Sequence, residues 1–239
     1  MTMEPHDQTR GDSAPFIDTR QTALLSRNEV AALCMKAARG AGMSWGLAEE
    51  AGYAAAWLVQ RGFDGPRYLK EHLAHAQGRD WAHHRPTVTP DAWQAPSGKA
   101  LCPVTLGAAL CDHADLPGGP LSGDTIRIDT VDHPALLLPF LATIAVSGDS
   151  LTDIAWEDGA VCIGGEPSAL APAIAAFEGR RMPLSLTARP GKVQAVPDAD
   201  TPRIAAATIA ALNDLAMLTT VPASDASRAG AGSTAGDDD

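Results

Sequence analysis

The sequence has few aromatic residues, an excess of acidic over basic residues and no long apolar run. Aromatic side chains make up 5% of the 239 residues, whereas alanine alone occurs 45 times, so we expect a core of mainly small side chains. The 18 basic residues are outnumbered by 29 acidic ones, and no basic stretch lies beside aromatic residues. Because nucleic acids and anionic membrane surfaces attract cationic proteins, we expect neither as a partner.

The sequence also lacks features of a secreted or membrane-spanning chain. The longest apolar stretch, residues 135–146, is interrupted by Pro139 and falls short of the about 20 residues that span a bilayer. Residues 1–20 carry acidic side chains and no apolar centre of a secretory signal. No Cys-x-x-Cys pair is present, so we expect a soluble, cytoplasmic, bacterial protein whose cysteines are reduced. These cysteines are Cys34, Cys102, Cys111 and Cys162.

Residues 22–79 are predicted to form a subdomain of three helices, after a disordered lead-in of residues 1–21. Ser26 and Glu29 have the spacing of a capping box, and apolar residues then recur at helical spacing. Ser44 is expected to begin the second helix and Asp64 the third, with a glycine ending each one.

The rest of the ordered chain is predicted to form a sheet with covering helices. Residues 80–124 are expected to be an irregular connector with a short helix near Val104–Leu110. Within residues 125–221, Asp158-Gly159 and Pro190-Gly191 each predict a hairpin, and hairpins pair their strands antiparallel. The predicted fold class is therefore α+β: a three-helix N-terminal subdomain, then a mostly antiparallel sheet with covering helices.

The segment from Lys36 to Glu50 contains the first set of candidate site residues. Lys36 and Arg39 lie three residues apart on a predicted helix, next to a glycine-rich turn, and could hold a carboxylate. Glu49 and Glu50 follow in the next helix and are candidate catalytic acids or bases if burial raises a carboxyl pKa. The alternative is an ordinary helical hairpin with a solvated charged face.

The second set of candidate site residues lies in the glycine- and aspartate-rich tail, residues 222–239. Ser227 and Arg228 precede glycines that could bind an anion, and Asp239 ends a run of carboxylates that could bind a cation or an amine. With Lys36 and Arg39, these three residues form the predicted substrate-binding set. The alternative is a disordered tail.

The histidines suggest further chemistry but do not form a known metal motif. His72 and His75 lie three apart on a predicted helix, and His83-His84 follow, so a zinc-dependent hydrolase remains an alternative. Because His72 lies on the apolar face, we favour a hydrogen-bonded core histidine and predict no metal site. The weaker candidates for nucleophilic or acid–base chemistry are Cys111-Asp112-His113 and Asp132-His133.

Two groups of motifs indicate a family. The stretch from Leu25 through Lys36-Ala-Ala-Arg-Gly-Ala-Gly42 to Ala51, and the ending Ser227-Arg-Ala-Gly-Ala-Gly with its aspartate run, resemble a bacterial family known only as domain of unknown function 3726. The resemblance covers residues 24–239 and implies no activity. The helices of Ala37–Gly65 are also similar in rhythm to those of the malate/lactate/sulfolactate dehydrogenases that lack a Rossmann fold. The Ser-His that those enzymes use is absent from residues 61–66.

These observations favour an enzyme of small-molecule metabolism that acts on a small anionic, carboxylate-type substrate. The alternative is a non-catalytic accessory or binding subunit of a metabolic enzyme complex. Expected partners are a small-molecule ligand and either a second protein or further copies of the chain. The sequence identifies no cofactor.

Overall fold

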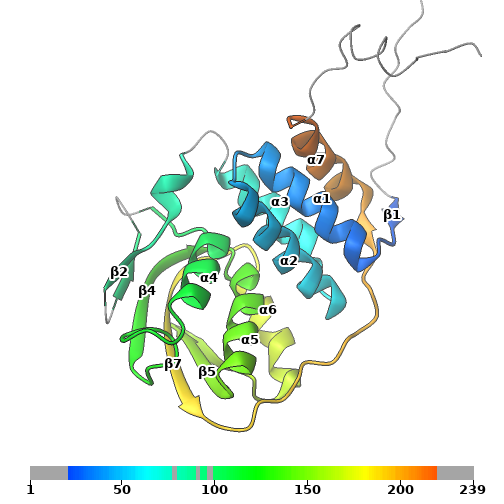
Figure 1. Cartoon of the computed structure of the whole chain (residues 1–239). Helices are drawn as coiled ribbons and strands as arrows, with labels where there is room; N and C mark the ends of the chain where they lie inside the picture. Colours follow the sequence, from blue (N-terminus) through cyan, green and yellow to red (C-terminus); the bar gives the residue numbers. More distant parts are fainter. Residues whose placement is uncertain (1–20, 77–79, 90–91, 96–98, 220–239) are drawn as a thin grey trace, which may run out of the picture.

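The computed structural model describes residues 21–76, 80–89, 92–95 and 99–219. Figure 1 shows a group of helices beside a curved sheet that has its own helices. The three predicted N-terminal helices are present: α1 (Arg27–Gly40), α2 (Trp45–Gln60) and α3 (Gly65–Ala76). The capping box at Ser26 and Glu29 forms as predicted, with both reciprocal hydrogen bonds in place.

The helical group is completed by an element from the far end of the chain. The last helix, α7 (Ala206–Met217), packs against α1, and a Cβ atom on Gly40 would overlap the carbonyl oxygen of Leu215. A two-stranded sheet joins the same two regions, because β1 (Thr22–Ala23) pairs antiparallel with β8 (Ile204–Ala205).

The main sheet has six strands in the order β2-β3-β4-β7-β5-β6. All neighbouring pairs are antiparallel except β3 and β4, which confirms the α+β class with a mostly antiparallel sheet. The strands are β2 (Thr87–Thr89), β3 (Ala92–Gln94), β4 (Thr125–Asp132), β5 (Ser150–Trp156), β6 (Gly159–Ile163) and β7 (Arg181–Pro190).

In the part of the chain that the structure describes, three helices and three 3-10 turns accompany this sheet. Helices α4 and α5 lie against the sheet in Figure 1. The ring of Phe140 in α5 packs directly on Gly107 of α4 and leaves no room for a side chain at position 107. The helices are α4 (Pro103–Asp112), α5 (Leu138–Ser147) and α6 (Leu170–Phe177), and the turns are η1 (Trp81–His84), η3 (Pro134–Leu137) and η4 (Pro167–Ala169). The short helix expected within residues 80–124 is therefore α4.

Of the two predicted hairpins, one forms and the other does not. β5 and β6 pair across Asp158-Gly159 as predicted. Residues 192–196, directly after Pro190-Gly191, form no strand, so the prediction of a second hairpin is wrong. Both edges of β7 are already occupied, by β4 and by β5, so residues 192–196 have no free edge to join. The chain instead crosses back to the helical group and reaches β8.

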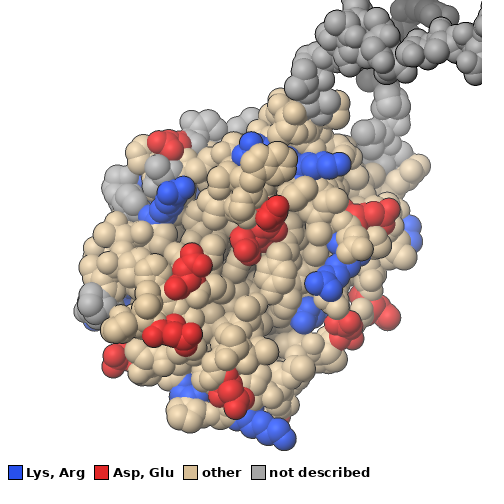
Figure 2. Space-filling model, viewed as in Figure 1, with Lys and Arg blue, Asp and Glu red and all other residues tan. Residues whose placement is uncertain are grey.

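The surface carries mixed charge. On the face shown in Figure 2, acidic and basic side chains are scattered among uncharged ones without a continuous basic patch. None of the helices in the described part of the chain is both long enough and apolar enough to cross a membrane.

Candidate functional site

A buried carboxylate, Asp132, lies where the sheet meets the helical group. It is the last residue of β4, just beyond a register shift between Ile128 and Val131 in the pairing with β7. Such irregularities re-aim side chains at the end of a strand. The next residue, His133, has a left-handed backbone with φ of 47° and ψ of 65°. This conformation is uncommon outside glycine and is found where the surrounding structure enforces it.

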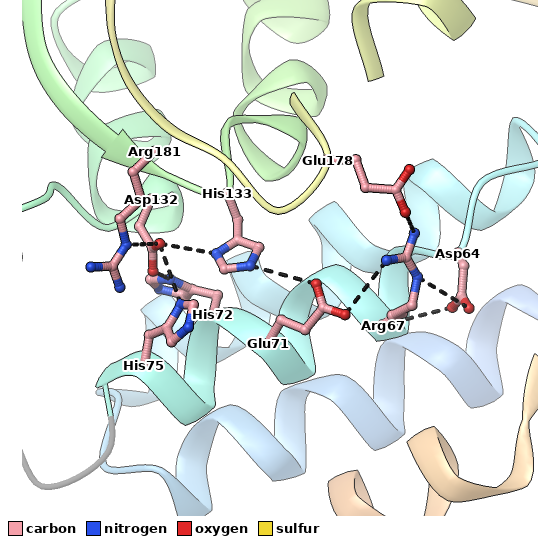
Figure 3. Close-up of polar contacts among 9 residues, drawn as sticks. All are labelled: Asp64, Arg67, Glu71, His72, His75, Asp132, His133, Glu178 and Arg181. Carbon is pink, nitrogen blue, oxygen red and sulfur yellow. Dashed lines mark hydrogen bonds and ion pairs between the residues drawn. The ribbon is translucent and has the colours of Figure 1, made fainter. Parts of the chain in front are cut away.

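Four basic side chains surround the Asp132 carboxylate (Figure 3). His72 places Nδ1 2.8 Å from Oδ2. The other three approach Oδ1: Arg181 donates through Nε at 2.7 Å, and the Nδ1 atoms of His133 and His75 lie at 3.1 and 3.5 Å. These groups come from α3, β7 and the end of β4, so the cluster connects three elements distant in sequence. We call these five residues the Asp132 cluster.

The two buried histidines of the cluster each have a further partner on their second ring nitrogen. Nε2 of His72 lies 3.1 Å from Sγ of Cys102. Nε2 of His133 lies 3.6 Å from Oε2 of Glu71. The other carboxylate oxygen of Glu71, Oε1, lies 3.5 Å from Nη1 of Arg67. Both rings are therefore fixed from outside while their Nδ1 atoms face Asp132.

Electrostatics in the cluster favour charged forms despite burial. Burial disfavours the Asp132 carboxylate, but His133 and His72 outweigh this and hold its pKa well below the ordinary value. Burial likewise opposes a charged His72, yet Cys102 and Asp132 raise the pKa of His72 to about 9. Burial opposes ionisation of Cys102 too, and His72 nevertheless lowers the pKa of that thiol. Opposite charges a few ångströms apart have this effect in a poorly solvated site.

Three members of the cluster have the composition of a metal site. His72, Asp132 and His133 are all buried and offer one ligand atom each within 4.8 Å of the others. Nδ1 of His133 is buried but has no hydrogen-bond partner, although it lies beside Asp132. Two histidines and one carboxylate bind zinc and other divalent transition metals in proteins.

The cluster reaches the surface through its other two members. The side chains of His75 and Arg181 are 51% and 41% exposed, whereas that of His72 is 1% exposed. A small molecule arriving from solvent would therefore meet an imidazole and a guanidinium first.

The candidates of the Lys36–Glu50 segment lie elsewhere. Lys36 is an exposed residue of α1. The guanidinium of Arg39 donates to the carbonyl oxygen of Met43 and stacks on the ring of Trp45 at 4.7 Å. Arg39 is thus already engaged in closing the turn between α1 and α2.

Glu49 and Glu50 line a groove of about 570 Å³ beside α4 and α5, together with Asp112. Burial, Asp112 and Glu49 raise the pKa of Glu50, the direction that acid–base chemistry requires. Neither Lys36 nor Arg39 is among the residues that line this groove, and its three carboxylates suit a cation better than an anion. A catalytic role for the two glutamates stays a prediction.

Other predicted residues fall outside these sites. Ser227, Arg228 and Asp239 lie outside the described residues. Of the histidines suggested for zinc, His83 is exposed and His84 is buried with Nδ1 3.1 Å from the carbonyl oxygen of Ala100. His72 and His75 share the cluster instead with Asp132 and His133, 60 residues along the chain.

No local pattern in the sequence pointed to Cys102, Arg181 or Glu71 as site residues. One signal was available: Asp132-His133 follows a predicted strand, and polar residues at the ends of strands often form sites. The contacts of Asp132 with His72 and His75 of α3 depend on tertiary structure, which no local sequence pattern contains.

Comparison with known proteins finds a family model that matches the N-terminal third of the chain. Residues 25–102 match the model of a family described as "Protein of unknown function (DUF3726)", in agreement with the resemblance of the N-terminal motifs. No curated protein matches the chain. A solved structure, malate dehydrogenase from Entamoeba histolytica, aligns with a TM-score of 0.43 and 12% identity, over 56% of this chain. The chain covers 38% of that dehydrogenase.

Proposed function

We propose that the protein is an enzyme that acts on a small anionic, carboxylate-type substrate at a divalent transition-metal ion held by His72, Asp132 and His133. The observation that carries the proposal is the grouping of three buried ligand atoms, one each from His72, Asp132 and His133, within 4.8 Å of one another. Nδ1 of His133 lies 3.1 Å from Asp132 but does not make a well-aligned hydrogen bond, and such a buried atom costs free energy. Coordination of a metal ion by this nitrogen would remove that cost.

The surroundings of the two histidines support metal binding. Metal-bound histidines usually make a second interaction through their other ring nitrogen, which fixes the ring and its tautomer. Here Glu71 is placed to do this for His133, and Cys102 for His72. The ligand atoms of a tetrahedral zinc site are separated by roughly 3.3 Å, given bond lengths near 2.0 Å. Nδ1 of His72 lies 2.8 Å from Oδ2 of Asp132 and Nδ1 of His133 lies 3.1 Å from Oδ1, and one ligand atom from each residue lies within 4.8 Å of the other two.

The exposed side of the cluster supports an anionic substrate. Arg181 uses Nε to hold Asp132, which leaves the two terminal nitrogens of its guanidinium to bind a carboxylate. His75 lies on the same side and can donate a hydrogen bond or exchange a proton with substrate. When bound, the metal would polarise a substrate carbonyl or lower the pKa of a bound water.

The first test measures metal binding by the full chain. After treatment with EDTA, titration calorimetry with Zn²⁺ and Mn²⁺ should show one site per chain. His133→Asn should weaken binding by at least about tenfold, since asparagine tolerates a left-handed backbone and preserves the turn. His83→Asn is the matched control, because His83 is exposed and outside the cluster. Binding that is absent, or equal in the wild type and His133→Asn, would refute the metal site.

The second test concerns the substrate. Oxalate and pyruvate, which can bind a metal through two oxygens, should raise the melting temperature of the metal-loaded protein, and less so for Arg181→Gln. Turnover of a panel of 2-oxo and 2-hydroxy carboxylates would then be followed by NMR. Metal binding and oxalate binding without turnover of any substrate would favour the accessory-subunit alternative over an enzyme.

A second candidate function rests on Cys102. Its Sγ lies 3.1 Å from Nε2 of His72, whose Nδ1 contacts Asp132, and Cys102 caps the N-terminus of α4. A cysteine, a histidine and a carboxylate in this order can form a nucleophilic thiolate. Cys102 is fully buried, however, so a substrate could reach it only after a movement of the chain.

One pair of variants separates the two candidates. For a metal enzyme, Cys102→Ser should retain stoichiometric metal and part of the activity. For a thiol enzyme, the same variant should lose all activity, and iodoacetamide should inactivate the wild type. Cys111→Ser serves as the control, because Cys111 lies outside the cluster. A cytoplasmic location and a role in bacterial metabolism remain expectations.

A further inference from the structure

A separate cavity lies at the end of α2, apart from the Asp132 cluster. It has a volume of about 330 Å³ and is bounded by α2, by α5 and by the segment that follows β7. Its walls are largely apolar and include Trp57, Val146, Val193 and Val196. Arg61 is the charged residue in the lining, and no residue of the Asp132 cluster contributes.

Arg61 is held in place in this cavity by uncharged groups, and the charge of Asp198 also attracts its guanidinium. Its guanidinium lies 3.8 Å from the centre of the Trp57 ring, and Nη1 donates to the carbonyl oxygen of Trp57 at 3.1 Å. Nε is buried and has no hydrogen-bond partner. The nearby carboxylate of Asp198 accepts a hydrogen bond from the Gln60 side chain at 2.8 Å instead.

Burial makes the charge of Arg61 costly. It lowers the pKa of the guanidinium, although arginine stays protonated at any physiological pH. Arg61 is therefore a partly exposed cation in the lining of the cavity, and an anion that enters the cavity would neutralise its charge.

The rest of the cavity favours an apolar body on that anion. Val146 is 65% exposed at the edge of the cavity, and Val193 and Val196 line the same space. Pockets for small molecules begin at about 300 Å³ and combine apolar walls with a few polar groups. An aromatic ring on the ligand could also pack beside the Trp57–Arg61 stack.

We propose that this cavity is a second binding site, for a small monocarboxylate with an aromatic or branched apolar body. The carboxylate pairs with Arg61, and the apolar part is covered by the valines. The backbone of Gln194 donates to Gly164 at 2.7 Å and that of Ala199 to Gln60 at 2.9 Å, which holds the segment after β7 over the cavity. A bound ligand thus connects this segment to α2 and α5.

The test uses phenylacetate as the probe and the full chain as the protein. Titration calorimetry should show one saturable site, and the dissociation constant should rise at least about tenfold in Arg61→Gln, as expected for loss of a charged hydrogen-bond partner. Phenylacetamide, which has the same shape without the charge, should bind the wild type more weakly by a similar factor. Arg180→Gln is the matched control, because Arg180 is exposed and pairs with Asp158 elsewhere.

A second variant keeps the test decisive if Arg61→Gln folds poorly. Val146→Asp places a carboxylate at the exposed edge of the cavity and should abolish phenylacetate binding by repulsion. His133→Asn should leave phenylacetate binding unchanged, which separates this site from the proposed metal site. Absence of saturable binding to the wild type would overturn the proposal, and so would binding by both Arg61→Gln and Val146→Asp that is as tight as binding by the wild type.

Discussion

Nδ1 of His133 lies 3.1 Å from Oδ1 of Asp132 and has no hydrogen bond, while Nε2 of the same ring faces Glu71. The ring is therefore held through Nε2, and its Nδ1 faces Asp132. His72 also directs Nδ1 at Asp132, in a hydrogen bond of 2.8 Å, and its Nε2 faces Cys102. This shared orientation of two rings toward one carboxylate distinguishes the cluster from a simple buried ion pair.

The outer partner of His133 should tune metal affinity. Glu71→Gln keeps the size of the side chain but removes the charge that faces Nε2, so metal affinity should fall by about 10–100-fold. Competition with a fluorescent chelator measures this change. Glu166→Gln, an exposed residue far along the chain, is the control. Unchanged affinity in Glu71→Gln would mean that His133 is not oriented through this contact.

Removal of the central carboxylate charge should destabilise the metal-free protein. Asp132→Asn leaves His72 and Arg181 without their counter-charge in a buried site, and loss of one partner from such a group costs about 3–5 kcal/mol. Urea unfolding of the EDTA-treated protein measures the free energy.

The matched control for that substitution is Asp153→Asn. Asp153 pairs with Arg189 at 2.7 Å on the surface, and exposed pairs contribute only about 0–1 kcal/mol. If Asp132→Asn lowers the free energy of unfolding no more than this control does, the charge of Asp132 does not stabilise the cluster.

The contact between α1 and α7 should not tolerate a side chain at position 40. A Cβ atom on Gly40 would overlap the backbone of Leu215, so Gly40→Ala should lower the free energy of unfolding by about 1–3 kcal/mol or more. Gly46→Ala has open space and should be neutral or stabilising by up to about 1 kcal/mol, because alanine favours a helix. Chemical denaturation compares the two variants, and equal stabilities would argue against close packing of α7.

The raised pKa of Glu50 should make stability depend on pH. Its causes are burial, Asp112 and Glu49, so the folded protein holds the proton more tightly than the unfolded chain. This contribution is present below the ordinary pKa of 4.5 and is lost as pH rises through the higher folded value.

Glu50→Gln removes the ionisable group and should therefore gain stability over the wild type as pH increases above about 4.5. Unfolding curves at several pH values measure the difference between the two proteins. Glu157→Gln, at the exposed turn between β5 and β6, is the comparison variant. A difference that does not grow with pH would show that Glu50 is not destabilised by its surroundings.

The elements that sequence reasoning located are those with local signals. Ser26 and Glu29, three residues apart, mark the start of α1. The adjacent residues Asp158 and Gly159 likewise mark the turn between β5 and β6. Residues 192–196 follow an equally good turn but form no strand, because the free edges of β7 were taken by β4 and β5. That outcome depends on strand order, which no local pattern contains.

The candidate site was predictable only in parts. His72 and His75 share one face of a helix and could be grouped from their spacing, and Asp132-His133 could be noted as a pair. Their meeting depends on the fold, which brings residues 60 positions apart within 2.8 Å. The contribution of Arg181, from β7, depends on the pairing of β7 with β4.

The pairing of β1 with β8 has a consequence for how the chain is made. Thr22 pairs with Ala205, and α1 packs against α7, so the first helix meets this partner only after α7, more than 160 residues further along the sequence, has been synthesised. During translation the face of α1 that α7 will cover is therefore exposed, and contacts so distant in sequence are slow to form. Folding on the ribosome should stall at this step, with chaperone binding concentrated on the unpaired face of α1.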